Sequence, residues 1–320
     1  TELNTTGSMV STGSNCRFRT TFVPSDKNAV LTVTWKNIIF KFGRLKADKP
    51  GGKIKFVFVN CILEGFSING HEDAKEFISL SLHLYQCTWI GKARTMTISW
   101  SKWMKFIDYD FYSVHVHNTD LIVRDSNVTN VRFYMSSHYF RVHFINVLCQ
   151  IGQHIDRSII SILPYEKLHY TEDKREFWFM SRNSITMEKS IVTSIVSKSV
   201  VSLISQIFIS VHRHNVFVKL SHCWFDKISR VLKISAKNLN NDPDPNSKKA
   251  MDIHIGLFLN VVIFNSNFSN IMGGKQGKIT GVIQIVIPQF LSPMVLGKIS
   301  IVDCMFDNIT MSSPGGAVYV

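Results

Sequence analysis

The sequence lacks the apolar pattern of an amphipathic helix. No window keeps apolar residues at positions i, i+3, i+4 and i+7 for about three turns. Strong helix formers are scarce, whereas Ile, Val, Ser and Thr are abundant and the chain holds 23 Phe, 8 Tyr and 6 Trp. Aromatic and β-branched residues pack well on a pleated, half-buried surface. The composition therefore argues against a helical protein and predicts an all-β chain.

No apolar run is long enough to cross a membrane. A span needs ~20 consecutive apolar residues, but residues 190–211 are interrupted by Lys198 and Gln206, and residues 280–297 by Pro288 and Pro293. We therefore expect no membrane span in this segment. The chain starts at Thr1 without a basic and then apolar leader, so we expect any signal peptide to have been removed or to lie outside it.

Acidic residues are too few to balance the basic ones. The formal net charge is +13 at pH 7, which implies attraction to polyanions such as nucleic acid, acidic glycans or anionic lipids. The basic residues are scattered through loops and form no single tract. Two interpretations stay open, a generally basic solvated surface and a dedicated binding surface.

One short pattern can be aligned with itself along the chain. Residues 263–271 match residues 301–309 when Ser266 is laid on Cys304. Both copies have an apolar strand end, a small residue, an aromatic residue two positions later and an aliphatic residue three further. The same frame fits Cys223, and looser copies lie around Cys61, Cys87 and Ser126. Self-similarity of this kind indicates a repeat architecture.

The spacing of the copies distinguishes between repeat folds. The clear copies are 43 and 38 residues apart, and the early ones 26. Propeller blades of about 40 residues do not fit the shorter spacing. A parallel β-helix fits all of them, because surplus residues leave the coils as loops while stacked coils share one core. We predict an all-β right-handed parallel β-helix, a single solenoid over residues 29–320, after a loosely ordered lead-in over residues 1–28.

The cysteines show no metal-binding spacing. Cys16, Cys61, Cys87, Cys149, Cys223 and Cys304 include no Cys-x-x-Cys pair. Four of them share the small position of the repeat, which indicates buried residues that fill a tight corner. Because neighbouring coils lie ~4.8 Å apart, near the usual Cα separation of a disulfide, a bond between Cys61 and Cys87 also stays open.

The last residues, 302–320, resemble the repeats of extracellular β-helix proteins. Phe306-Asp307-Asn308 and Gly315-Gly316-Ala317-Val318 are similar to the aromatic-x-x-Asn and Gly-Gly-Ala-aliphatic motifs of polymorphic outer-membrane adhesins and of pectin-lyase-like animal ectodomains. Asn308 follows its aromatic residue by two positions instead of three, and Gly-Gly-Ala occurs once. The resemblance implies an extracellular or cell-surface protein. Because the strand pattern runs to Val320, we expect a fragment that continues beyond it.

Asn-x-Ser/Thr triplets mark candidate glycosylation sites. They occur at Asn4, Asn127, Asn267 and Asn308. Asn127 and Asn267 share one position of the repeat, just after the small corner residue. That placement predicts exposed corners, where a bulky glycan is tolerated.

The sequence shows no complete catalytic or metal site. Asn118-Thr119-Asp120 resembles the first catalytic motif of polygalacturonases, but the Asp-Asp, Gly-His-Gly and Arg-Ile-Lys motifs of that family are missing. Cleavage of a glycosidic bond needs a second carboxylate beside the first. His115 with His117, and His212 with His214, have no third ligand at a telling spacing. We therefore predict no catalytic residue, metal or cofactor.

These observations favour a recognition or adhesion protein that binds acidic polysaccharide or a surface receptor. Loops carry recognition, so the predicted polyanion-binding residues are Lys248, Lys249, Lys275 and Lys278. Nucleic acid is not an expected partner. The alternatives are a polysaccharide lyase or glycoside hydrolase of the pectin-lyase-like fold, and a structural spacer within a larger receptor.

Overall fold

The computed structural model describes 15 stretches of the chain, and every statement below concerns these residues: 2–6, 19–22, 29–41, 43–47, 52–70, 79–91, 111–152, 158–163, 182–195, 205–211, 215–236, 257–273, 281–286, 295–311 and 316–319. These stretches contain strands, turns and bends, and no helix. The strand pairs between them are parallel throughout. The prediction of an all-β chain is confirmed, and the sheets are parallel.

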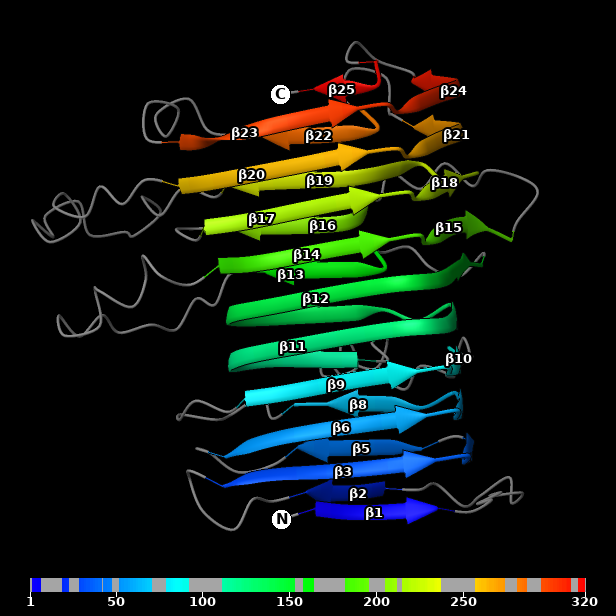
Figure 1. Cartoon of the computed structure of the whole chain (residues 1–320), viewed down its shortest axis with the longest axis vertical. Coiled ribbons are helices and arrows are strands. Elements are labelled where there is room, and N and C mark those ends of the chain that lie inside the picture. Colours follow the sequence, from blue (N-terminus) through cyan, green and yellow to red (C-terminus); the bar gives the residue numbers. More distant parts are fainter. Residues whose placement is uncertain are drawn as a thin grey trace, which may run out of the picture.

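The strands stack in columns along the molecule (Figure 1). The front column contains β1 (Glu2–Thr6), β3 (Val30–Lys36), β6 (Lys53–Val59), β9 (Ser79–Tyr85), the middle of β11 (Phe111–Thr129) and of β12 (Phe133–Ile151), β14 (Arg182–Glu188), β17 (Asn215–Ser221), β20 (Leu257–Phe264) and β23 (Val295–Val302).

The other two columns consist of shorter strands. The side column contains β4 (Ile39–Lys41), β7 (Ile62–Glu64), β10 (Thr88–Ile90), the ends of β11 and β12, β15 (Ile191–Ser194), β18 (Trp224–Asp226), β21 (Asn267–Gly273) and β24 (Met305–Met311). The back column contains β2 (Arg19–Phe22), β5 (Arg44–Ala47), β8 (Ser67–Asn69), the beginnings of β11 and β12, β13 (Ile160–Leu163), β16 (Ser205–Val211), β19 (Arg230–Ala236), β22 (Ile283–Val286) and β25 (Val318–Tyr319).

A front, a side and a back strand that follow one another in the chain form one rung. Each strand pairs with its counterpart on the next rung, as β3 with β6, β4 with β7 and β5 with β8. The long strand β11 bends through all three columns, because it pairs with β8, β9 and β10 at successive positions. Equivalent residues on neighbouring rungs are between 21 and 51 residues apart in sequence, as Val116 and Ser137 are at the lower limit and Leu232 and Ile283 at the upper.

The register confirms the repeat that the sequence predicts. Phe225 pairs with Phe268, which in turn pairs with Phe306, and Ile271 pairs with Ile309. Phe225 and Phe268 are fully buried, and Phe306 packs against the core while partly exposed. The predicted interior position of these rings is therefore confirmed for two of them and partly met for Phe306.

The corner between front and side columns has the same backbone conformation on every described rung. One residue there has a positive φ, between 46° and 58°, a region that Asn and Asp tolerate better than other residues with a side chain. The residues are Asn37, Asn60, Gln86, Asp125, Asn146, Lys189, His222, Asn265 and Asp303. Some of their side chains bond along the stack, as when the Asn60 amide donates to Asn37 Oδ1 over 2.8 Å.

The residue after each positive-φ position explains why Ser and Cys recur. The Ser266 hydroxyl donates to the carbonyl of Phe264 over 3.0 Å, and the backbone N–H of Cys223, one rung below, donates to this hydroxyl over 3.2 Å. The Cys223 thiol donates in the same way to the carbonyl of Ser221 over 3.3 Å. Ser and Cys are small enough for this corner and satisfy a backbone acceptor there. Four of the repeat cysteines fill it as predicted, although Cys304 is only partly buried.

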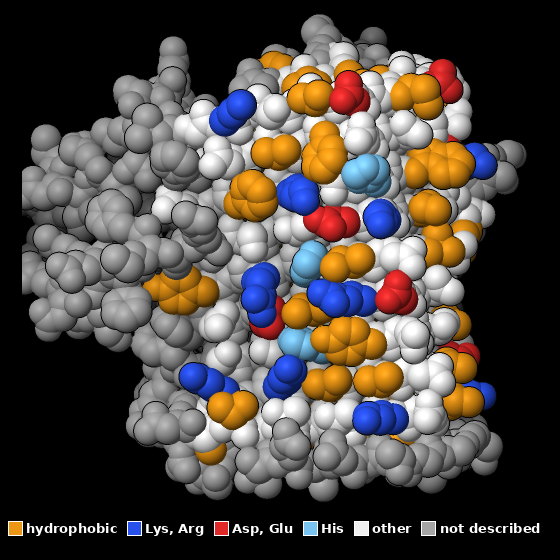
Figure 2. Space-filling view, viewed as in Figure 1, with side chains coloured by type: hydrophobic (Ala, Val, Ile, Leu, Met, Phe, Trp, Pro, Cys, Tyr) orange, Lys and Arg blue, Asp and Glu red, His pale blue; other side chains and the backbone are white. Residues whose placement is uncertain are grey.

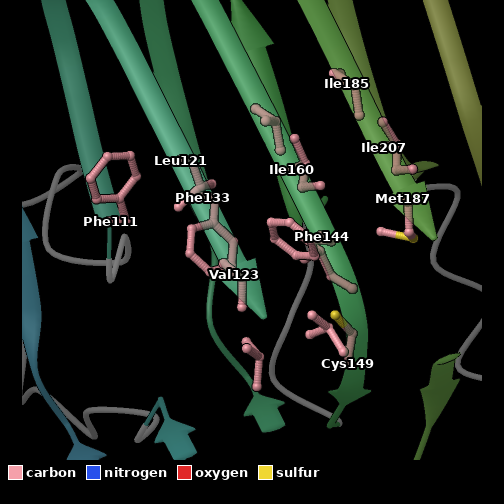
Figure 3. Close-up of a cluster of buried hydrophobic side chains, with 14 of the residues drawn as sticks. Phe111, Leu121, Val123, Phe133, Phe144, Cys149, Ile160, Ile185, Met187 and Ile207 are labelled. Carbon is pink, nitrogen blue, oxygen red and sulfur yellow. The ribbon is translucent and has the colours of Figure 1, made fainter. Parts of the chain in front are cut away.

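The three columns enclose a continuous apolar core. Inward side chains from successive rungs meet there, as Phe133 does with Phe111 at 6.2 Å and with Phe144 at 5.4 Å between ring centroids (Figure 3). Near the C-terminal end, Phe268 stacks on Phe225 at 5.3 Å and on Phe306 at 4.7 Å. Stacking of like rings on neighbouring rungs is the physical basis of the aromatic position in the repeat.

The stretch that the sequence sets apart as a lead-in contains paired strands. Within residues 1–28, β1 pairs with β3 and β2 with β5. Further along the chain, β13 lies between β12 and β16. The division into a lead-in and a main body at residue 29 stays a prediction.

Candidate functional site

The outward face of the front column collects polar and charged side chains from rungs that are far apart in sequence. Alternation along each strand buries one set of side chains, such as Leu82 and Leu84 of β9, and turns the other set outward, such as Tyr85. Figure 2 shows Lys, Arg, His and acidic side chains gathered along the middle of this face, with hydrophobic side chains between them. We refer to the outward side chains from β3 to β23 as the front face.

A hydrogen-bonded network around Asp120 lies at the centre of the front face. Arg141 of β12 donates to both carboxylate oxygens of Asp120 in β11, from Nε over 2.7 Å and from Nη2 over 2.8 Å. His83 of β9 lies on the other side, with Nε2 at 3.1 Å from Asp120 Oδ2, and its Nδ1 is 3.1 Å from the Tyr85 hydroxyl. Side-chain contacts therefore run from Tyr85 through His83 and Asp120 to Arg141 and connect the three strands.

The charge of Asp120 fixes the direction of these hydrogen bonds. Burial raises the pKa of Asp120, but the hydrogen bonds from Arg141 and His83 outweigh it and hold the pKa below its ordinary value. An ionised carboxylate accepts and cannot donate. Nε2 of His83 therefore carries a proton, and in a neutral imidazole Nδ1 is the nitrogen that accepts from the Tyr85 hydroxyl.

A second ion pair lies two strands further along the face. Lys219 Nζ donates to Glu188 Oε1 over 2.7 Å, and this bond lowers the pKa of Glu188. His143 lies between the two pairs. Its pKa is lowered by burial and by Arg124, Arg141 and Lys219, although Glu188 acts against them. Both carboxylates on the described front face are thus engaged by cations.

Several cations on the same face have no such partner. In the part of the chain that the structure describes, Lys55 and Arg124 are within ion-pair distance of no carboxylate. Arg124 is exposed and lies opposite Tyr85 in the strand register. The front face therefore keeps a net positive charge, because its carboxylates are neutralised and part of its cations are not.

Apolar rings accompany these charges. Phe217 and Phe264 are half-buried on the outward side of β17 and β20. Lys219 Nζ lies 5.6 Å from the centre of the Phe264 ring, and His222 meets that ring edge-on at 5.3 Å. Aromatic side chains offer large contact area at low cost in conformational entropy. Charge and ring faces together make a flat surface that can hold an anionic ligand with apolar faces.

Three of the four predicted glycosylation sites lie on the side column, and the fourth lies on the front column. Asn127 and Asn267 are exposed at the first outward position of their side-column strands, in one row with Trp224 and Met305. Asn308 is also exposed, but its Nδ2, the atom that a glycan would modify, donates to Asn270 Oδ1 over 2.7 Å. Asn4 belongs to β1. Whether a glycan is attached stays a prediction at each site.

The lysines and histidines singled out in the sequence fall mostly outside the described residues. Lys248, Lys249, Lys275 and Lys278 lie outside the described residues, as do His212 and His214. His115 and His117 belong to β11, where the structure describes their backbone. Among the described side chains, no three His, Cys, Asp or Glu residues come together as a metal site. Asp120 is the residue of the polygalacturonase-like triplet, and its partners are Arg141 and His83 instead of a second carboxylate.

The sequence interpretation missed His83, Tyr85, Arg124 and Arg141 as a group. His83 is 37 residues from Asp120, and Arg141 is 21 residues from it. An alignment of the corners that directly follow Tyr85, Arg124 and Ile145 would have placed Asp120 beside Arg141. The reason is that Tyr85, Arg124 and Ile145 are partners in the strand register and form one row of the face.

The fold and the face define an all-β protein with parallel sheets and a basic outward surface. Compared with models of protein families, with curated protein sequences and with solved structures, the chain gives no match in any of the three searches. Across the ranges described above, no helix has the length and apolar character needed to span a bilayer.

Proposed function

We propose that the chain is part of a secreted or cell-surface recognition and adhesion protein whose front face binds acidic glycans. The observation that carries this proposal is the charge arrangement of the front face. Asp120 and Glu188 are neutralised by Arg141 and Lys219, while Lys55 and Arg124 have no carboxylate partner among the described residues. The formal net charge of +13 acts in the same direction over a longer range.

The proposal includes the architecture. In a single parallel β-helix the chain pairs in parallel within the same column on every rung, as the described strands do. Such a fold tolerates a variable number of residues between rungs. Connections between parallel strands are right-handed in the great majority of proteins, so the right-handed form is the one we propose. The pectin-lyase-like affinity and the extracellular location follow from the resemblance of residues 302–320 to adhesin repeats.

The geometry of the face suits a linear polymer. Outward residues of neighbouring strands repeat every ~4.8 Å across the sheet, so cations on several rungs can contact successive acidic groups. Phe217 and Phe264 supply ring faces beside Lys219, against which the apolar side of a sugar ring can lie. A linear glycan with carboxylate or sulfate groups therefore fits the face better than a compact anion.

The test is binding to heparin as a model acidic glycan. We expect retention at low salt that falls steeply as salt rises, because exposed charges are screened beyond about 8 Å at physiological ionic strength. Replacing Lys55 and Arg124 together by Ser should weaken binding about tenfold and reduce the dependence of log affinity on log salt by about two, as for polyanion contacts in general. Affinity is measured by titration at several salt concentrations.

A charge-matched control distinguishes a site from general basicity. Replacing Lys41 and Lys227 by Ser removes two cations from the side-column strand β4 and the turn after β18, and it should leave most of the affinity. Equal losses in both double variants would contradict a front-face site. A loss confined to the Lys248, Lys249, Lys275 and Lys278 variant would move the site to those loops. Absence of binding at low salt would favour the spacer function.

A second function, eliminative cleavage of the same class of polymer, is favoured by the contacts of Tyr85. The Tyr85 hydroxyl faces His83 Nδ1, which Asp120 orients from behind, and Arg124 lies opposite Tyr85, where it can neutralise a uronate carboxylate. The Tyr85 hydroxyl would pass its proton to His83 Nδ1. At the same time the Tyr85 oxygen would take the proton from the sugar carbon that bears the uronate carboxylate. The glycosidic carbon–oxygen bond then breaks, a carbon–carbon double bond forms, and the leaving oxygen takes a proton back from Tyr85, which His83 restores.

This second function is tested with a uronate-containing polysaccharide. Unsaturated uronate ends absorb in the ultraviolet, and their release is the readout. The Tyr85→Phe variant should lose at least about a hundredfold in rate, the lower end of general acid–base contributions, while heparin binding persists. Tyr134→Phe, in the back-column part of β12, serves as the control. If the unaltered protein releases no unsaturated ends, the cleavage function is rejected and the binding proposal stands.

A further inference from the structure

Two cysteines occupy the same corner position on neighbouring rungs. Cys61 precedes β7 and Cys87 precedes β10, and these strands pair so that Ile62 faces Thr88. The backbone N–H of Thr88 donates to the carbonyl of Cys61 over 2.9 Å, which continues the ladder through the corner. The two residues are therefore stacked one above the other, and both are buried at 1% and 2% exposure.

Both thiols have the same orientation in the corner. Cys61 Sγ donates to the carbonyl of Val59 over 3.3 Å, and Cys87 Sγ donates to the equivalent carbonyl, that of Tyr85, over 3.2 Å. Each sulfur also lies near a carbonyl of the rung below, that of Trp35 for Cys61 and that of Phe58 for Cys87. Parallel side chains on strands ~4.8 Å apart meet the Cα separation that a disulfide needs, about 4.4–6.8 Å.

The pair also has the acidity that thiol–disulfide exchange requires. The neighbouring Cys87 side chain lowers the pKa of Cys61, whereas the contact with Cys61 and burial raise the pKa of Cys87. The thiolate is the nucleophile in disulfide formation. Once the two side chains are in contact, Cys61 is therefore the more acidic thiol of the pair.

We propose that Cys61 and Cys87 form a disulfide between neighbouring rungs when the chain folds with a small-molecule disulfide as oxidant. The Cys61 thiolate attacks one sulfur of the oxidant and releases one small thiol. Cys87 then gives up its proton and displaces the second small thiol from Cys61. In total the two cysteines lose two protons and two electrons, and the oxidant is reduced to two thiols. Because both side chains are buried in the finished fold, the bond forms as these rungs close.

The other described cysteines lack such a partner. Cys223 lies between the corner residues Ser190 and Ser266, and Cys304 follows Ser266 on the next rung. Cys149 points into the core beside Val128 and Val192, where burial raises the pKa of its thiol to about 12. Cys223 is therefore a matched control, since it occupies the same kind of corner without a stacked cysteine.

The test refolds the reduced, unfolded chain in a buffer of reduced and oxidised glutathione. The product is alkylated under denaturing conditions without further reduction, digested and analysed by mass spectrometry. We expect most molecules to give a cross-linked peptide pair that joins Cys61 to Cys87, two hydrogens lighter than the separate peptides, with Cys149 and Cys223 alkylated. Recovery of Cys61 and Cys87 as alkylated thiols, or cross-linked to Cys16 instead, would overturn the proposal.

Thermal unfolding gives an independent readout. A reductant should lower the Tm of the oxidised protein, because a disulfide restricts the unfolded chain. The Cys223→Ser variant should show the same downward shift. The Cys61→Ser and Cys87→Ser variants should show no shift, since neither can form the bond. A shift that persists in both of these variants would also contradict the proposal.

Discussion

Replacing Phe268 by Ala is expected to lower the free energy of unfolding by about 3–5 kcal/mol, the range for removing a large buried ring. The ring is fully buried. It stacks on Phe225 with an interplanar angle of 6° and on Phe306 with an angle of 8°. The rungs are fixed by their backbone ladders, so the neighbours cannot collapse into the space and the cavity term adds to the lost burial.

The matched control is Phe264→Ala in β20, at an outward position two residues before Ser266. That ring is half-buried and contacts His222 and Lys219, so we expect a loss of about 1 kcal/mol. Both variants are compared with the parent protein by urea denaturation. The comparison is valid when all three proteins have the same slope of unfolding free energy against urea concentration. A loss below about 1.5 kcal/mol for Phe268→Ala, the lower end for burial of a Phe side chain, would contradict the stacked interior.

The part of the fold that could be predicted from the sequence depends on the corner chemistry. The copies with Ser or Cys at the corner, such as Cys223, Ser266 and Cys304, were aligned correctly because both residue types satisfy the same carbonyl. The rungs that turn at Ile38 and Val147 were missed, since a branched apolar residue fills that corner by packing alone. The rung that turns at Ser190 was also missed, although it has the Ser corner, because Val192 occupies the position of the aromatic residue. A simple pattern of residue types cannot represent both solutions.

The site could be predicted less well than the fold. Its residues are neighbours through the register of β9, β11 and β12, and the sequence distance between neighbouring rungs follows no fixed period. Asp120 was noticed for its triplet with Asn118 and Thr119, yet its partner Arg141 is set by the stack. The loop lysines were predicted because loops carry recognition, whereas a sequence does not reveal which cations on successive strands are neighbours.

The second large effect is expected at Asp120. Asp120→Asn keeps the shape of the side chain and removes its charge, so the bonds from Arg141 and His83 lose their ionic acceptor. We expect the free energy of unfolding at pH 7 to fall by about 1.5–3 kcal/mol, the range for hydrogen bonds to charged groups. The carboxylate is 14% exposed, although the Arg141 side chain is 61% exposed, so a larger loss is not expected.

The pH dependence identifies the cause of that loss. The folded-state pKa of Asp120 lies below its ordinary value, which is about 3.9 for an unfolded chain. Its contribution is therefore complete above the unfolded-state pKa and is lost as the pH falls through the folded-state pKa. Urea denaturation from about pH 7 to about pH 2 should show the difference between parent and Asp120→Asn constant at first and shrinking below about pH 4.

The loss of stability in Glu188→Gln is compared with that in Asp120→Asn. The comparison distinguishes a mostly buried carboxylate, that of Asp120, from the surface ion pair of Glu188. Glu188 and Lys219 are 31% and 32% exposed, so solvent screens their attraction and the expected loss is below about 1 kcal/mol. If the two variants lose equal stability, or if the Asp120→Asn difference does not change with pH, the ionised Asp120 is not what holds these strands together. The ranking of Asp120 above Glu188 follows from its deeper burial and from its larger number of bonds, since Asp120 contacts both Arg141 and His83 whereas Glu188 accepts one bond from Lys219.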